Sequence, residues 1–175
     1  MPFKAVLMAI LISPMIVPLI ITAAGMFFFY SKIGLTHTYL GLILAHTALG
    51  TPFVVITVTA TLTGFDTNLI RASQSLGADT MRTFFKVIMP LILPGVISGG
   101  LFAFITSFDE VVIVMFIGSV EQITIPKQMW AGLRQETSPV ILCMATCLVA
   151  LSIALLTTVE MLRRRSERLR GIKQR

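Results

Sequence analysis

The stretch that decides the fold is IRASQSLGADTMRTFFKVIMPLILPG, residues 70–95. Its first half is polar and charged and is interrupted by Gly77, whereas its second half is apolar and carries Pro90 and Pro94. The segments on either side of it are long and almost free of charge. The first half of this stretch is therefore a polar break between segments that are apolar enough to lie in lipid.

The composition of the whole chain predicts an integral membrane protein. Of its 175 residues, 55% are hydrophobic and only 13% are charged, and the mean hydropathy is +0.90. Ordinary soluble domains contain about 25% charged residues. The two cysteines, Cys143 and Cys147, are four residues apart in one apolar run, a poor geometry for a disulfide, and are interpreted as packing residues.

Four apolar segments are long enough to cross a bilayer, for which a helix needs roughly 20 residues. They predict an all-α membrane protein with one transmembrane domain over residues 1–175, whose four helices span residues 5–30, 39–62, 95–118 and 139–162. Prolines inside the first two segments predict bends, which serve either as flexing points or as static kinks that improve packing.

The basic residues predict the orientation of these helices. If both termini are cytoplasmic, all but three of the 14 basic residues lie inside, the exceptions being Lys32, Lys127 and Arg134. The positive-inside rule favours this arrangement. The loop 63–94 and the basic tail 163–175 are then both cytoplasmic, and topology accounts for the tail without a nucleic-acid partner.

The loop 63–94 predicts two short helices joined by a tight turn. The first has its apolar residues at helical spacing, and Gly77 follows it as a residue suited to end a helix in the left-handed conformation. Asp79 is placed to cap the second helix. Its apolar face comprises Met81, Phe84, Phe85 and Ile88.

Two prolines are expected to end this elbow. Pro90 is expected to stop the second short helix, and Pro94 to occupy the first turn of the next membrane span. A helix pair of this size is marginal in water by itself. It therefore packs against a partner protein or the ends of the bundle, or rests on lipid headgroups as an interfacial hairpin.

The motif RASQSLGA followed by FFKVIMPLILPG resembles the EAA loop of ATP-binding-cassette importer permeases. The resemblance implies that this loop docks on a cytoplasmic ATPase dimer and couples it to the membrane helices. Arg71 replaces the usual leading Glu and Ser73 the usual second Ala, a charge change at the implied interface. The implied coupling residues are Arg71, Ala72, Ser73, Leu76, Gly77, Ala78, Phe84 and Pro90.

Further segments resemble the spermidine/putrescine branch of these MetI-like permeases, namely SKIGL, LAHTALGTPFV, LFAFITSFDEVVIVMFIG and ITIPKQMWAGLRQETSP. The resemblance implies a multi-pass protein of a bacterial inner membrane. It also implies a second permease subunit in a heterodimer and an extracytoplasmic solute-binding protein. Those permeases typically have six membrane helices, so the first two are expected to be missing here.

The sequence predicts a transport subunit and not an enzyme. It contains no G-x-x-x-x-G-K-[S/T] phosphate loop and no cluster of metal ligands, so no cofactor is expected on this chain. The resemblance implies that ATP and Mg²⁺ are used by the partner ATPase.

Asp109 and Glu110 are expected inside the third membrane helix, toward its outer half. A charged carboxylate at that depth costs roughly 2.5–3.5 kcal/mol, and the four spans offer no Lys or Arg to pair with it. The acids therefore line a path for a cationic substrate, or else stabilise helix packing through hydrogen bonds.

Two further residues have alternative interpretations. Trp130, in a predicted short surface helix, either stacks on an amine along the path or anchors the protein at the membrane interface. His46 is interpreted as a packing residue bonded to another helix, with a proton relay as the alternative.

Two other functions fit the same residues. One is an ion-coupled carrier or channel that uses Asp109 or Glu110 and needs no ATPase. The other is a truncated fragment that does not transport.

Overall fold

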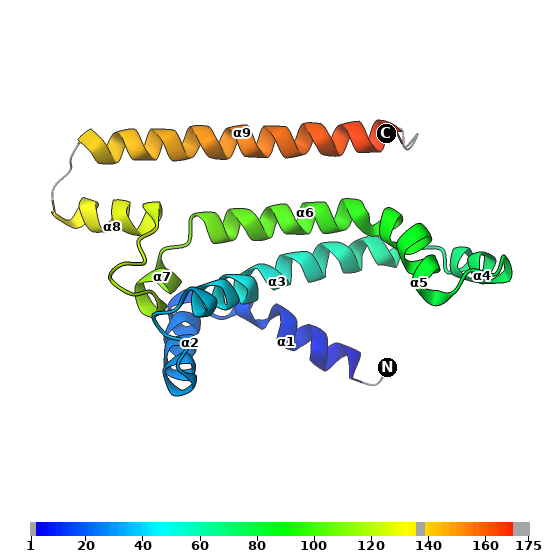
Figure 1. The fold of residues 1–175 in the computed structure, drawn as a ribbon, viewed down its shortest axis with the longest axis horizontal. Coiled ribbons are helices and arrows are strands. Elements are labelled where there is room, and N and C mark those ends of the chain that lie inside the picture. The colour runs from blue at the N-terminus through cyan, green and yellow to red at the C-terminus, as the bar shows by residue number, and fades with distance from the viewer. Residues whose placement is uncertain (1–2, 136–138, 170–175) are drawn as a thin grey trace.

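The computed structural model describes residues 3–135 and 139–169, and every regular element in these ranges is helical (Figure 1). This confirms the predicted all-α fold. The helices are α1 Lys4–Ile16, α2 Leu19–Ile33, α3 Tyr39–Thr63, α4 Asn68–Ser75, α5 Thr80–Thr83, α6 Met89–Phe108, α7 Val112–Ile117, α8 Ile125–Gln135 and α9 Pro139–Leu169, with a π-helical turn at Phe84–Ile88 between α5 and α6.

Among the described residues, three helical stretches are long and apolar enough to cross a membrane: Tyr39–Thr63, Thr80–Phe108 and Pro139–Thr158. The pair α1 and α2 adds a fourth if the two count as one span, but they are bent by 110°. The first predicted span is therefore two helices. The bend occurs because Pro18 has no N–H to continue α1 and favours the extended backbone seen at Val17.

The third span differs from its predicted limits of 95–118, because helical structure already begins at Thr80 and ends at Phe108. The expectation that Pro90 stops a helix is therefore wrong. Pro90 lies in the first turn of α6, where a missing N–H is tolerated, and the π turn leads the chain into that position. Pro94 lies inside α6, one turn later than the first-turn position predicted for it.

The antiparallel pair α3 and α6 forms the centre of the protein (Figure 1). Small residues of α6 lie directly against the α3 backbone. A Cβ atom added to Gly95 would lie 3.0 Å from the carbonyl oxygen of Thr57, and a Cβ atom added to Gly99 would lie 2.6 Å from the Cα of Val54. Gly50 of α3 faces Ala103 in the same way. The small-residue spacing on α6 therefore permits close helix packing, as expected for membrane helices.

Gly99→Ala is expected to destabilise the α3–α6 pair. Its new methyl group would overlap the Val54 backbone, and overpacking of this kind costs about 1–3 kcal/mol. Thermal unfolding of the detergent-solubilised protein measures the change as a lower Tm.

Gly100→Ala is the matched control, because a Cβ at Gly100 meets nothing within 4 Å. It should leave Tm unchanged or raise it, since Ala favours a helix over Gly by about 1 kcal/mol. Equal Tm values for the two variants would contradict the close packing.

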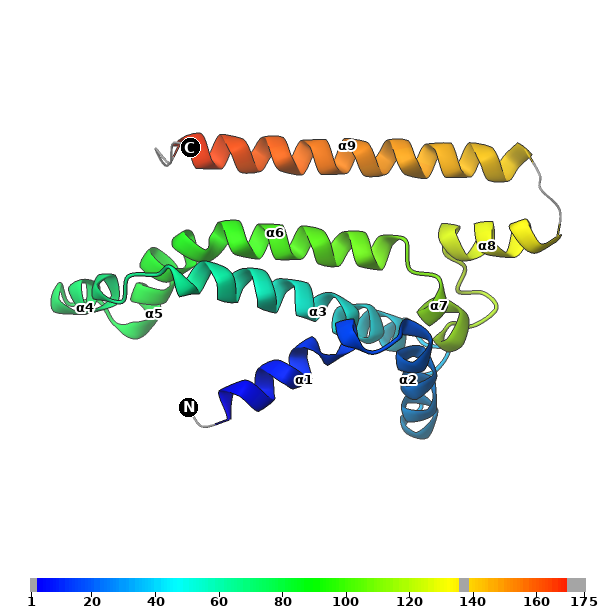
Figure 2. The same ribbon diagram turned by 180° about the vertical axis from the view of Figure 1, so that it is seen from behind.

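The two ends of the molecule differ. The start of α1, the helices α4 and α5, and the end of α9 lie toward one end in both views, which we call the elbow end (Figures 1 and 2). Helices α2, α7 and α8 lie toward the opposite end. The charges predict that the elbow end is cytoplasmic. In the predicted basic tail, residues 170–175 lie outside the described residues.

The core at the opposite end is built by α2, α3 and α7. Its buried apolar side chains are Ala23, Tyr30, Ala45, Leu49, Ile113 and Ile117. By contrast, α9 runs alongside α6, but the most apolar part of its segment Pro139–Thr158 has no buried residue (Figure 2). The apolar surface of α9 is thus available to lipid or to another protein.

Candidate functional site

The elbow between α4 and α5 has the geometry that its sequence predicts. Gly77 follows the end of α4 with a φ of +82°, a left-handed conformation that glycine adopts without strain. The Asp79 carboxylate accepts a hydrogen bond from the backbone N–H of Arg82 at 2.7 Å and so caps α5. The predicted glycine turn and Asp79 cap are both confirmed.

A hydrogen bond that the sequence did not indicate closes the elbow. The hydroxyl oxygens of Ser73 on α4 and Thr83 on α5 are 3.0 Å apart, and Thr83 is buried. A threonine ten residues from its partner carries no local sequence signal, so only the fold reveals this pair. The bond links the two short helices directly.

The apolar side chains of the elbow point outward instead of into the bundle. Leu76, at the turn, is 88% exposed, and Leu69, Met81 and Phe85 are also exposed. Among the other implied coupling residues, Arg71, Ala72 and Gly77 are exposed, while Ser73, Ala78, Phe84 and Pro90 are half-buried. The elbow therefore presents an apolar surface that its own chain does not cover.

The two adjacent acids lie in a helix break and not within a span. Helix α6 ends at Phe108 and α7 begins at Val112, which corrects the expectation that Asp109 and Glu110 belong to one helix over residues 95–118. In the break the two side chains have different surroundings, since Glu110 is buried and Asp109 is exposed.

Glu110 stabilises the start of α7. Its carboxylate accepts hydrogen bonds from the backbone N–H groups of Val112 at 2.9 Å, Ile113 at 2.7 Å and Val114 at 3.4 Å. The first N–H groups of a helix have no acceptor within the helix itself, and a capping side chain provides one. These hydrogen bonds agree with the packing role that was one of the two alternatives for Glu110.

Glu110→Ala is expected to lower the free energy of unfolding by about 1–3 kcal/mol, because buried N–H groups would lose their acceptor. Thermal unfolding in detergent measures this as a lower Tm. Asp109→Ala is the neighbouring control. An equal loss of stability in both variants would contradict the assignment of the cap to Glu110.

Asp109 opens onto cavities around the C-terminal end of α6. One, of about 410 Å³, lies between α6, α8 and α9 and is lined by both Asp109 and Trp130. A second, of about 570 Å³, lies at the α1–α2 bend and includes Asp109 and Pro18. The predicted short helix around Trp130 is confirmed as α8. The structure thus brings together the exposed acid and the aromatic residue, while Glu110 binds α7.

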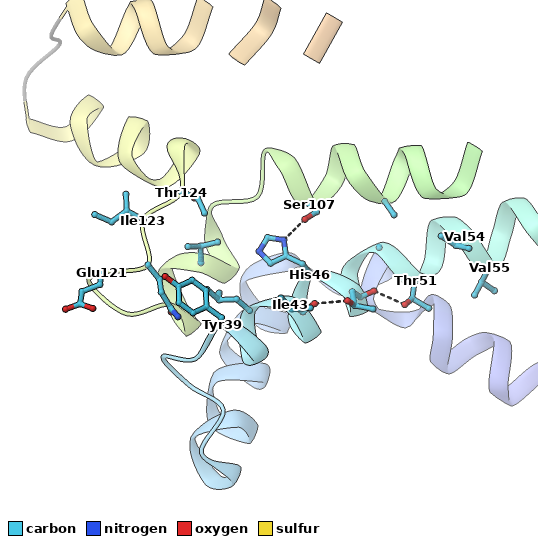
Figure 3. Close-up of a pocket in the computed structure, with 16 residues that line it drawn as sticks. Tyr39, Ile43, His46, Thr51, Val54, Val55, Ser107, Glu121, Ile123 and Thr124 are labelled. Atoms are coloured by element: carbon cyan, nitrogen blue, oxygen red, sulfur yellow. Dashed lines mark hydrogen bonds between the residues drawn. The ribbon is translucent and has the colours of Figure 1, made fainter. Parts of the chain in front are cut away.

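A groove of about 860 Å³ lies between α3 and α6, has a mostly apolar lining and was not indicated by the sequence. His46 lies in its middle, with Nδ1 2.8 Å from the Ser107 hydroxyl oxygen of α6 (Figure 3). This contact agrees with the interpretation of His46 as a residue bonded to another helix. Tyr39 and Glu121 lie at one end of the groove and Val54 and Val55 at the other (Figure 3).

Comparisons with known proteins agree with this geometry. A family model described as binding-protein-dependent transport system inner membrane component matches residues 2–168. The spermidine/putrescine transport system permease protein PotC of Haemophilus influenzae is 30% identical over 152 residues, which are 87% of this chain and 59% of that protein. The putrescine transport system permease protein PotI of Escherichia coli K12 is 28% identical over 145 residues, 78% of this chain and 51% of that protein.

The fold is also found in a solved transporter. A chain of the MetNI methionine ABC transporter, in an inward-facing conformation, superposes with a TM-score of 0.72 at 21% identity, covering 93% of this chain and 73% of that one. The fold is therefore that of ABC transporter permeases. The chain belongs to the binding-protein-dependent transport system inner membrane component family. It spans between half and three fifths of the length of the PotC and PotI relatives.

Proposed function

We propose that this protein is a membrane-spanning permease subunit of an ATP-driven importer for polyamines such as putrescine and spermidine. The observation that carries the proposal is the elbow, an EAA-like motif folded as two short helices with an uncovered apolar surface. The relatives named for spermidine and putrescine transport support the substrate class.

The elbow is the contact with the ATPase in this proposal. Leu76 and the exposed apolar residues beside it fill a groove of an ATPase dimer that binds ATP and Mg²⁺. The Ser73–Thr83 bond links α4 to α5, so that the two short helices move together and transmit movement of the ATPase to α6. An acid on the ATPase facing Arg71 would compensate for the absent Glu of the motif.

The substrate path includes the cavity that Asp109 and Trp130 line. A carboxylate binds an ammonium group, and an indole face attracts a cation. The remaining parts of the complex are a second, different permease subunit and an extracytoplasmic solute-binding protein. The complex lies in a bacterial inner membrane, and both termini of this chain are in the cytoplasm. The uncovered surface of α9 is open to such neighbours or to lipid.

Uptake by the full complex in liposomes tests the proposal. Labelled putrescine and spermidine should accumulate only when ATP is present on the ATPase side. Uptake that needs an ion gradient and no ATP would favour an ion-coupled carrier or channel instead. Binding of the ATPase without any uptake would favour a fragment that does not transport.

A further inference from the structure

The groove between α3 and α6 is lined by hydroxyl groups whose protons are already engaged. The Thr47 hydroxyl donates to the Ile43 carbonyl at 2.7 Å, and the Thr51 hydroxyl donates to the Thr47 carbonyl at 2.7 Å (Figure 3). Each hydroxyl oxygen keeps lone pairs that accept hydrogen bonds. Along this part of α3 the groove therefore offers acceptors to a ligand.

The histidine in the groove also has a ring nitrogen to offer. His46 uses Nδ1 for the Ser107 hydroxyl, and Nε2 has no hydrogen bond to any residue that the structure describes. The Nε2 atom is therefore free to accept a hydrogen bond from a ligand, or to donate one, according to the tautomer of the ring.

One acidic residue lies at the rim of the groove. Glu121 is its one charged lining residue, and its carboxylate has no ion pair or hydrogen bond within residues 3–135 and 139–169. The nearby Lys127 ammonium donates to the carbonyls of Ser119 at 3.1 Å and Gln122 at 3.2 Å and makes no direct ion pair with Glu121. The remaining lining is mostly apolar, including Val54 and Val55.

We propose that this groove is a second binding station for the substrate, and that it takes a linear alkyl chain with ammonium ends. This inference rests on the proposed function. An ammonium group carries three donors and no acceptor, which matches the carboxylate at one end and the acceptors in the middle. The apolar lining contacts the methylene groups between them. Asp109 does not line this groove, so the station is separate from the cavity beside Trp130.

Protection of a cysteine from a thiol reagent tests the station directly. Thr51→Cys is introduced into the full complex in liposomes after Cys143→Ala and Cys147→Ala, because both native cysteines are exposed. A cationic thiosulfonate reagent should label Thr51→Cys. Putrescine at about ten times its half-saturating concentration should slow this labelling roughly tenfold, because about one site in ten stays free.

Thr63→Cys is the matched control. Thr63 lies on the same helix, is exposed, donates its hydroxyl to the Thr59 carbonyl at 2.8 Å in the same pattern, and does not line the groove. Its labelling should not respond to putrescine. Absence of labelling at Thr51→Cys, or labelling that putrescine leaves unchanged, would overturn the station.

A second variant covers the case in which Thr51→Cys does not fold. Glu121→Gln changes an exposed loop residue outside the buried core and should raise the KM for putrescine several-fold with little change in kcat. An unchanged KM would overturn the station. Uptake by the unmodified complex is measured in parallel, so a complex without putrescine uptake contradicts the proposed function, whereas normal uptake without protection contradicts only the groove.

Discussion

Leu76→Asp is expected to abolish binding of the ATPase to the purified permease complex. Leu76 is 88% exposed at the turn of the elbow, so the substitution removes no contact that holds this chain together. Burying a leucine in a partner contributes about 1.5–3 kcal/mol. Burying an unpaired carboxylate there instead costs several kcal/mol more. The affinity should therefore fall by more than about 100-fold, which co-purification and substrate-stimulated ATPase activity both measure.

Val120→Asp is the control for an exposed apolar side chain that becomes charged. Val120 is 90% exposed and precedes α8, away from the elbow end. It should leave co-purification of the ATPase unchanged. If Leu76→Asp retains the ATPase as well as Val120→Asp does, the elbow is not the docking surface.

Leu76→Asp also separates the two interpretations of the elbow that its sequence leaves open. If the elbow is a hairpin resting on headgroups, Leu76→Asp weakens its contact with anionic lipid but ATPase binding persists. If the elbow is docked on the ATPase, the variant loses the ATPase. The long apolar helices keep the protein in the membrane in both cases, so ATPase binding is the measurement that separates them.

The sequence predicts the elbow well because its signals are local. A left-handed glycine and a capping aspartate act within a few residues of their own positions, and both are found where expected. The end of the second short helix was mispredicted, because a proline is compatible with the first turn of a helix as well as with its end. Only the π turn before Pro90 shows which applies.

The surroundings of the two predicted acids depend on the fold in a similar way. Composition and helix length place Asp109 and Glu110 near the outer end of a membrane span, but they do not show that the helix breaks there. Two adjacent acids look equivalent in a sequence. They differ because three N–H groups of α7 bind Glu110, whereas Asp109 remains exposed to the cavities. The groove around His46 depends on residues far apart in the chain, so no local pattern indicates it.

Asp109→Asn is expected to lower kcat/KM for putrescine uptake by about 10- to 150-fold. A hydrogen bond to a charged group contributes about 1.5–3 kcal/mol, and the amide loses the charge that attracts the ammonium group. The variant should fold normally, because the Asp109 side chain makes no hydrogen bond or ion pair within the described residues. Labelled uptake at several putrescine concentrations measures the effect, and Asp109→Glu, which keeps the charge, should lose much less.

Glu110→Gln shows whether the effect belongs to Asp109 alone. Glutamine keeps one oxygen that can accept from the α7 N–H groups, so part of the cap and most of the uptake should survive. If uptake instead falls equally in Asp109→Asn and Glu110→Gln while both proteins unfold at the normal temperature, both acids contact the substrate. The cap would then be a feature of the substrate-free protein, and α7 would have to release Glu110 each time a cation passes.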